Sequence, residues 1–365
     1  MKFVLSLLLL LLYSTLTLAE TVKIGLIIPL TGNQSVFGLD AKRALKLIAP
    51  NGTLEKENYT YSFILEDGQC GVGRSAITAA QKLLNIDKVK FLVLGCSGEV
   101  LQVAPLAQKS HVITIGYASS HPDIKNLGDY IFRTYVDITK AIHLIGALIS
   151  EEQPGNVAVL TEESAFTLGI KKELLSFLGD RVGYSEDFHV DEVQFQTLLI
   201  KTQKTNPKAY YLNTASPRTY QNLYRQLRQL GITTPVYAYH SPSDPEVLSG
   251  LGTLQDGVKF VATPEVTSGS PSFEAFLDQY KTLYPEGPAI DFLLRSSYDA
   301  IMTLIQSIEA VGPDSEKVKN YLLAYQGEGA VGHISFDSNG DVENINFVLR
   351  QIKDGAPRPL MNNHS

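Results

Sequence analysis

The sequence predicts an α/β fold with two doubly wound parallel-sheet lobes, and three observations support this prediction. Apolar runs such as "VKIGLIIP" (22–29) alternate with segments of helical spacing such as "GLDAKRALKLIA" (38–49). The runs are apolar nearly throughout, which is typical of parallel strands covered by helices on both faces. The alternation occurs in two successive runs of roughly 120 residues, close to the usual size of a domain.

Each run contains the same succession of elements. In the first run, strands are expected at 22–29, 61–67, 90–95 and 111–116, and helices at 38–49, 73–85 and 98–109. After "YIFRTY" (130–135), strands are expected at 156–160, 182–188, 209–213, 235–239 and 257–263, and helices at 138–150, 167–178, 193–204 and 217–230. Such alternation is typical of sheets built from strand–helix–strand units.

The stretch 272–325 differs from the rest because it contains three helical patterns and no strand. Helices without strands of their own must cover a sheet made elsewhere in the chain, and we expect this to be the sheet of the first lobe. Two terminal strands, "GHISF" (332–336) and "NFVLRQIKDG" (346–355), follow. "DSNGD" (337–341) is interpreted as a hairpin turn rather than a calcium loop, since the rest of that motif is missing.

The N-terminus has the pattern of a secretory signal peptide over residues 1–19. Lys2 precedes the apolar stretch "FVLSLLLLLLYSTLTLA" (3–19), which is short for a membrane span and ends at a plausible cleavage position, Ala19. An uncleaved anchor is the alternative. We expect a periplasmic or otherwise extracytoplasmic protein that is soluble after cleavage of the signal peptide.

Composition narrows the range of partners. The chain of 365 residues has a formal net charge of −7 and no basic runs, which argues against binding nucleic acid or an anionic membrane surface. Its two cysteines, Cys70 and Cys96, each follow a predicted strand. In an exported chain a single disulfide is the simplest interpretation, and neighbouring parallel strands would bring both sulfurs to the same edge.

Sequence signatures of an enzyme are weak. "GQCGVG" (68–73) has neither the dinucleotide-binding nor the P-loop spacing, and the chain contains no GxSxG, HExxH or CxxC motif. We therefore expect that the protein is not an enzyme and that it binds neither a cofactor nor a metal. A secreted serine hydrolase that uses Ser97 is a competing hypothesis, but no histidine or base is placed to serve it.

A candidate ligand site lies where "FLVLGCSGEVLQVAPLA" (91–107) turns from strand to helix. Ser97 stands at the carboxyl end of that strand, and Ser119 and Ser120 follow the next strand. Ligands of open parallel sheets bind at these ends, where free helix amides favour anions. Three hydroxyls on adjacent loops can surround a carboxylate. Ordinary helix capping by serine is the alternative.

Several segments together resemble a known family. They are "KIGLIIPLTGNQSVFG" (23–38), "EDGQCGVGRSAITAAQKLLN" (66–85), the "VLGCSGEVLQVAPLA" segment (93–107), "YASSHPDIKNLGDYIFRT" (117–134) and "FDSNGDVENINFVLRQIKDG" (336–355). Across nearly the whole mature chain these are similar to the branched-chain amino-acid binding proteins of ABC transporters. The resemblance implies a type I periplasmic binding protein with three hinge crossings and a cleft that closes over its ligand.

The resemblance also implies boundaries for the two lobes, with hinge crossings near 138, 265 and 333. The N-terminal lobe would consist of residues 20–137 and 266–333. The C-terminal lobe would consist of residues 138–265 and 334–365.

The resemblance further implies roles for individual residues. Ser97 matches the family's carboxylate-binding serine, and Ala118 and Ser120 match a carbonyl and a hydroxyl that contact the ligand. Phe37 and Phe166 match aromatic positions in the first and second lobes.

The chain departs from the family pattern just after "PVYAY" (235–239), where His240 stands in place of an acidic residue that pairs the ligand's ammonium. Asp291 is our first candidate for a replacement acid, and Glu265 and Glu162 are the others.

From these features we expect the solute-binding protein of an ABC importer. The ligand would be an amino acid or a related small carboxylate, the partner an ABC permease, and the protein a monomer. A ligand-sensing subunit of a membrane receptor, built on the same bilobed domain, is the alternative.

Overall fold

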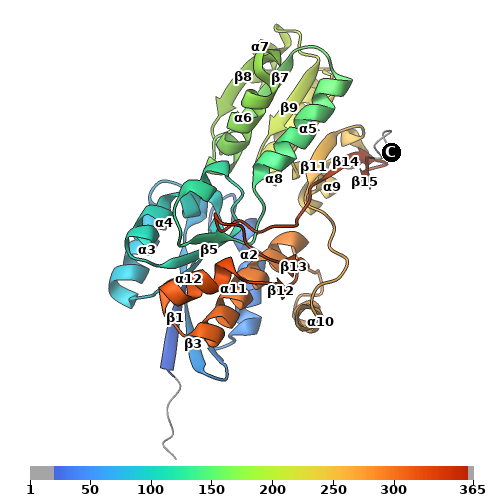
Figure 1. Cartoon of the computed structure of the whole chain (residues 1–365). Helices are drawn as coiled ribbons and strands as arrows, with labels where there is room; N and C mark the ends of the chain where they lie inside the picture. Colours follow the sequence, from blue (N-terminus) through green and yellow to red (C-terminus); the bar gives the residue numbers. More distant parts are fainter. Residues whose placement is uncertain (1–19, 361–365) are drawn as a thin grey trace, which may run out of the picture.

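The computed structural model describes residues 20–360, which form two α/β lobes placed one above the other (Figure 1). The predicted signal peptide, residues 1–19, lies outside the described residues. In each lobe a largely parallel sheet lies between apolar cores on both of its faces, so the predicted fold class is confirmed. Within residues 20–360, no helix has both the length and the hydrophobicity needed to cross a membrane.

The sheet of the first lobe has the strand order β2-β3-β1-β4-β5-β6, and its strands are parallel except β2. Helices α2, α11 and α12 pack on one face of this sheet, and α3 and α4 pack on the other. The elements are β1 (Glu20–Ile28), α2 (Val36–Ile48), β2 (Thr53–Glu55), β3 (Tyr59–Asp67), α3 (Ser75–Lys82), β4 (Phe91–Cys96), α4 (Ser97–Lys109), β5 (Ile113–Ala118), β6 (Ile131–Arg133), α10 (Pro271–Leu283), α11 (Asp291–Val311) and α12 (Ser315–Leu323).

The sheet of the second lobe has the order β15-β14-β11-β10-β9-β7-β8, and β14 and β15 at one side of it are the antiparallel strands. Helices α5 and α6 cover one face, and α7, α8 and α9 cover the other. The elements are α5 (Ile138–Glu152), β7 (Val157–Glu162), α6 (Ala165–Leu178), β8 (Val182–Phe188), α7 (Gln196–Gln203), β9 (Ala209–Asn213), α8 (Pro217–Gln229), β10 (Val236–Ala238), α9 (Pro245–Leu251), β11 (Lys259–Ala262), β14 (Val348–Lys353) and β15 (Ala356–Pro359).

The helices of the strandless stretch lie on the first lobe, where Figure 1 shows orange helices beside blue strands. Ile301 and Leu304 of α11 and Leu322 of α12 belong to the same apolar core as Ile24 and Leu26 of β1. Apolar burial stabilises a fold by about 25 cal/mol per Å². These helices therefore provide much of the first lobe's stability although they come late in the sequence.

The packing of residues 336–345 bears on the third crossing, which the resemblance places near 333. Phe336, Val342 and Ile345 pack in the first lobe's core. The expected strand 332–336 shrinks to β13 (His333–Ile334), which pairs with β12 (Gly327–Glu328) outside both lobe sheets. We therefore propose that the chain leaves the first lobe after residue 345. The other two boundaries stay predictions.

The reason for this position is the hairpin at "DSNGD". Phe336 and Val342 form an antiparallel bridge, and the carboxylate of Asp337 accepts hydrogen bonds from the backbone N–H groups of Asn339 and Asp341. The predicted hairpin turn is confirmed.

Arg133 connects three parts of the molecule and is completely buried. Its guanidinium donates two hydrogen bonds of 2.6 Å to the carboxylate of Asp341 in the hairpin and one of 3.2 Å to Asp137 at the start of α5. It also donates to the carbonyl oxygens of Ser119 and His121, at 3.3 and 3.0 Å. The loop after β5, the first crossing and the hairpin are thus held by one side chain.

Candidate ligand-binding site

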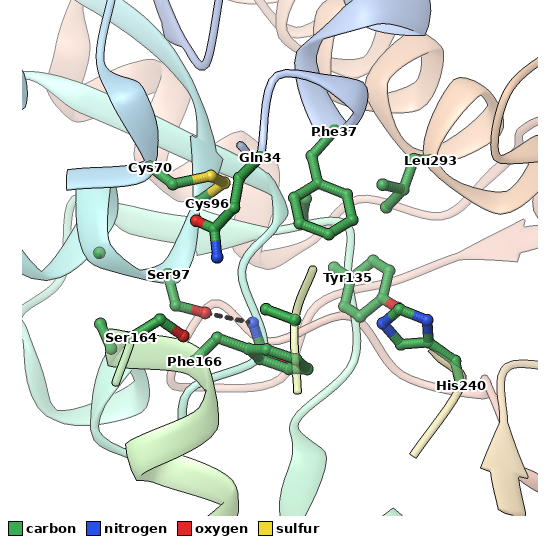
Figure 2. Close-up of a pocket in the computed structure, with 15 residues that line it drawn as sticks. Gln34, Phe37, Cys70, Cys96, Ser97, Tyr135, Ser164, Phe166, His240 and Leu293 are labelled. Carbon is green, nitrogen blue, oxygen red and sulfur yellow. Dashed lines mark hydrogen bonds between the residues drawn. A yellow bond between two sulfur atoms is a disulfide. The ribbon is translucent and has the colours of Figure 1, made fainter. Parts of the chain in front are cut away.

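A hollow lies between the two lobes (Figure 2). The first lobe contributes the ends of β4 and β5, and the second contributes the start of α6 and the loop after β10. Six of the residues singled out from the sequence line it, namely Phe37, Ser97, Ala118, Ser120, Phe166 and His240.

Ser97 and Ala118 are brought together by sheet register. The preceding residue, Cys96, pairs with Ala118 across the parallel strands β4 and β5. The hydroxyl oxygen of Ser97 accepts hydrogen bonds from the backbone N–H groups of Ser120 and His121, at 3.1 and 3.2 Å. Since these bonds occupy its acceptor capacity, Ser97 can act toward a ligand only as a donor.

Ser120 is 1% exposed and lines the same hollow. Its hydroxyl has no hydrogen-bond partner among the described residues. A buried hydroxyl without a partner costs about 1–3 kcal/mol. A ligand atom that bonds to it would recover this cost.

Two of the eight residues predicted to bind the ligand do not line this hollow. The Ser119 hydroxyl turns into the protein and donates to the carbonyl oxygen of Gly95 at 3.1 Å. Asp291 accepts a 2.7 Å hydrogen bond from Nε of Arg295 and lines an adjoining hollow beside the hinge. Of the three hydroxyls expected to surround a carboxylate, two line the hollow, those of Ser97 and Ser120.

The end of the hollow away from the serines is apolar and aromatic, as Figure 2 shows for Phe37, Tyr135, Phe166 and Leu293. The ring of His240 lies 6.3 Å from that of Phe166, measured between centroids. Burial lowers the pKa of His240 to about 4, so its imidazole is neutral near pH 7. The site combines hydroxyl donors at one end with an uncharged ring-lined end.

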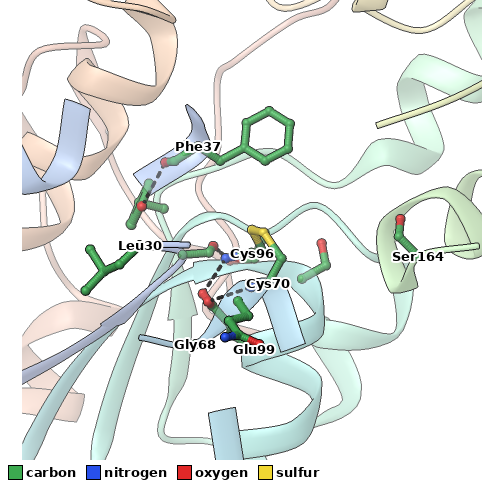
Figure 3. Close-up of a disulfide and its surroundings, with 12 residues drawn as sticks. Leu30, Phe37, Gly68, Cys70, Cys96, Glu99 and Ser164 are labelled. Atoms are coloured by element: carbon green, nitrogen blue, oxygen red, sulfur yellow. Dashed lines mark hydrogen bonds between the residues drawn. A yellow bond between two sulfur atoms is a disulfide. The ribbon is translucent and has the colours of Figure 1, made fainter. Parts of the chain in front are cut away.

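The disulfide between Cys70 and Cys96 is present, with a Cα–Cα distance of 4.9 Å (Figure 3). The expectation that the two strands before these cysteines are neighbours is wrong, because β1 lies between β3 and β4. The cysteines meet because the short 3₁₀ turn Gln69–Gly71 crosses over the end of β1. Both cysteines line the hollow.

The glycines around these cysteines allow the loops to approach closely. A Cβ on Gly98 would lie 2.3 Å from the carbonyl oxygen of Cys70. Gly71 has φ +82°, and a Cβ there would lie 2.5 Å from the backbone of Gly98. Any larger residue would push the disulfide-bearing turn away from the start of α4, which explains the Gly-Cys-Ser-Gly sequence.

Glu99 lies behind the disulfide and is completely buried. Its carboxyl oxygens accept hydrogen bonds from the backbone N–H groups of Cys96 and Cys70, at 2.8 and 3.1 Å (Figure 3). Burial nevertheless raises its pKa to about 8. Desolvation thus outweighs the hydrogen bonds, and the side chain is protonated near pH 7.

This protonation predicts a pH dependence of stability. Because the pKa of Glu99 is 4.5 when unfolded and about 8 when folded, unfolding releases a proton between these values, and stability falls as the pH rises through them. Glu162 and Asp299, whose pKa values burial raises to about 7, act in the same direction. Glu99→Gln should therefore flatten part of the decline in urea midpoint between pH 5 and 8. An unchanged decline would contradict this.

Sequence reasoning missed several residues that line the hollow: Gln34, Tyr135, Ser164, Ala165, Ala215 and Leu293. The amide of Gln34 points toward Ser97 in Figure 2. Tyr135 ends the "YIFRTY" segment, and this position beside the first crossing could have identified it as a residue that lines the hollow. Leu293 comes from α11 and could not be placed without the fold.

Glu162 holds a loop on the second-lobe side of the site in place. It is completely buried, and its carboxylate accepts hydrogen bonds from the backbone N–H groups of Ala215 and Ser216, at 2.7 and 3.0 Å. These bonds hold the loop after β9, of which Ala215 lines the hollow.

A family model described as "Periplasmic binding protein" matches residues 21–356. The chain belongs to this family. This match confirms its function as a solute-binding protein, and the relatives in the next paragraph confirm the resemblance to branched-chain amino-acid binding proteins.

Individual relatives agree with this membership. The leucine-, isoleucine-, valine-, threonine- and alanine-binding protein of Pseudomonas aeruginosa is 26% identical, over 93% of this chain and 92% of its own length. Among solved structures, a leucine-binding protein of Thermotoga maritima is similar with a TM-score of 0.79 and 24% identity, over 93% of this chain and 98% of that one. A solute-binding protein from Rhodopseudomonas palustris, solved with 3,4-dihydroxybenzoic acid, has a TM-score of 0.75 and 23% identity, over 93% and 96%. At these identities the solved structures show that the fold is shared by periplasmic binding proteins.

Proposed function

We propose that this periplasmic binding protein binds an amino acid or a related small carboxylate between its lobes and delivers it to an ABC permease. The observation that supports this ligand class best is the pair of hydroxyls on Ser97 and Ser120 at one end of a hollow with mostly apolar walls. We infer that the protein performs no chemistry and acts outside the cytoplasm as a monomer.

The chemistry of the serine end favours a carboxylate. Ser97 is limited to donation by its two backbone partners, and the Ser120 hydroxyl is free to donate. Ser97 also begins α4, whose first N–H groups and dipole favour a negative charge. Hydrogen bonds to a charged group contribute about 1.5–3 kcal/mol each. Together these donors can hold an anion without a lysine or arginine.

Closure of the lobes follows from the composition of the site. Phe37 and Ser97 belong to the first lobe, and Phe166 and His240 belong to the second. A ligand that contacts both sides stabilises the closed arrangement by its additional contacts there. Lys172 of the second lobe donates a 2.9 Å hydrogen bond to Asp123 of the first, so the two lobes are also in direct contact.

The ligand can be identified directly. The protein is purified gently from its native host, and mass spectrometry of the released small molecules names the retained ligand. Calorimetry with amino acids and simple carboxylates then measures affinities. Tight binding of a carboxylate supports the proposal, and binding of only uncharged solutes such as sugars would refute it.

The Ser97→Ala variant should bind the identified carboxylate about 1–3 kcal/mol more weakly, since a donor to a charged group is lost. Ser150→Ala is the control, because Ser150 is exposed on α5 and bonds only to the Gly146 carbonyl oxygen among the described residues. Calorimetry on both variants checks this. Equal affinities for Ser97→Ala and wild type would exclude Ser97 from carboxylate binding.

A further inference from the structure

The ligand-binding hollow lacks charged side chains. Among the described residues that line it, there is no aspartate, glutamate, lysine or arginine. Burial keeps the remaining titratable groups, His240 and Tyr135, uncharged near pH 7. An ammonium group that enters this hollow therefore meets hydroxyls, carbonyls and rings, and no formal negative charge.

The carboxylates that come nearest through the hinge side are already paired. Asp291 bonds to Arg295 at 2.7 Å, and Glu265 bonds to Arg350 at 2.6 Å. Both acids line the hollow beside the hinge, which adjoins the ligand hollow at Phe37, Tyr135, His240 and Leu293. Turning either acid toward the ligand would break its ion pair.

On the opposite side, the side chain of Glu162 already accepts hydrogen bonds from the backbone N–H groups of Ala215 and Ser216. Exposed Glu163, together with Glu162, Asp187 and Asp191, lines the wider hollow that adjoins the ligand hollow, and water weakens the pull of the Glu163 charge. An ammonium placed beside the hydroxyls of Ser97 and Ser120 would therefore lose its hydration without gaining an ion pair, which is costly.

His240 contributes an uncharged ring to the lining of the hollow. Its ring is packed against Phe166 and against Tyr239, with centroids 6.3 and 4.7 Å apart, and lines the hollow. Burial lowers the pKa of its imidazole to about 4, so the ring is neutral near pH 7. A neutral imidazole has one N–H donor and one acceptor. It can bond to a carbonyl or hydroxyl of a ligand, whereas it cannot neutralise a cation.

We propose that the hollow selects a small carboxylic acid with an apolar or aromatic body and no ammonium group, and that His240 sets this preference. The inference rests on the proposed function, since it assumes a carboxylate at the Ser97 end. It narrows the expected ligands from amino acids and related carboxylic acids to carboxylic acids that lack an amino group.

Matched ligand pairs test the proposal on the full mature protein. Leucine is compared with isocaproate, and phenylalanine with hydrocinnamate, by calorimetry. The deamino acid of at least one pair should bind at least about tenfold more tightly than its amino acid, because the unpaired ammonium must be desolvated. Tighter binding of the amino acid in both pairs would overturn the inference while leaving the proposed function intact. Failure of every carboxylate to bind would overturn both.

Substitution at 240 separates the role of charge from that of shape. His240→Asp places a carboxylate in the hollow and should shift the preference toward the amino acid by about tenfold or more. His240→Asn has nearly the same shape without the charge and should keep the wild-type order. An unchanged order in a folded His240→Asp protein, checked by its thermal melt, would show that His240 does not set the preference.

Discussion

Replacing Arg133 by methionine should lower the free energy of unfolding by about 3–5 kcal/mol, the usual effect of breaking a buried ion pair from one side. The substitution leaves the mostly buried carboxylate of Asp341 without the two hydrogen bonds of 2.6 Å that now hold it. It also frees the carbonyl oxygens of Ser119 and His121, so the loop that carries Ser120 should loosen and ligand affinity should fall. Urea denaturation and calorimetry measure the two effects.

Two further variants make this prediction specific. Lys125→Met removes an exposed partner of Asp137, 3.8 Å away, and should change stability little. Arg133→Met combined with Asp341→Leu should recover part of the loss, because an apolar pair of similar volume does not leave a charge unpaired. If the single substitution has no larger effect than Lys125→Met, the buried ion pair is not important for stability.

Removing the disulfide by Cys70→Ala with Cys96→Ala should cost about 3–4 kcal/mol of stability, since the bond closes a loop of 26 positions. The turn Gln69–Gly71 should also lose its fixed position against the start of α4. Because both cysteines line the ligand hollow, weaker ligand binding should accompany the loss of stability.

The chemical control is the wild-type protein with its disulfide reduced and alkylated. It should unfold at a urea concentration near that of the double variant and below that of the oxidised protein. Equal midpoints for all three proteins would mean that the cross-link adds nothing to folding stability.

Much of the fold could be predicted because the strands have strong local signals. The runs 182–188 and 209–213 are the observed bounds of β8 and β9. The edge strands β2 and β15 were not predicted, since short antiparallel edges lack the apolar run that marks a buried strand. The proposed position of the third crossing depends on the pairing of Arg133 with Asp341, which no local pattern reveals.

The candidate site shows the same division. Ser97 and Ser120 could be predicted because helix starts and strand ends fix their positions in a parallel sheet. Ser119 does not line the hollow because its hydroxyl turns away and donates to the Gly95 carbonyl oxygen. Asp291 does not line it because its carboxylate is paired with Arg295. Such competition depends on residues far away in sequence, and only the folded arrangement determines it.

The late position of α11 and α12 has a consequence for synthesis of the chain. β1 is made first, yet the face that includes Ile24 and Leu26 is fully covered only when α11 and α12, at 291–323, join α2. The first lobe therefore cannot complete its core until almost the whole polypeptide has left the ribosome, whereas helices α5–α9 follow the strands of the second lobe closely. Contacts between distant parts of a chain form slowly, and uncovered apolar surface attracts factors that hold unfolded chains. A chain that stays unfolded until its end is made can still be threaded through a narrow channel in a membrane.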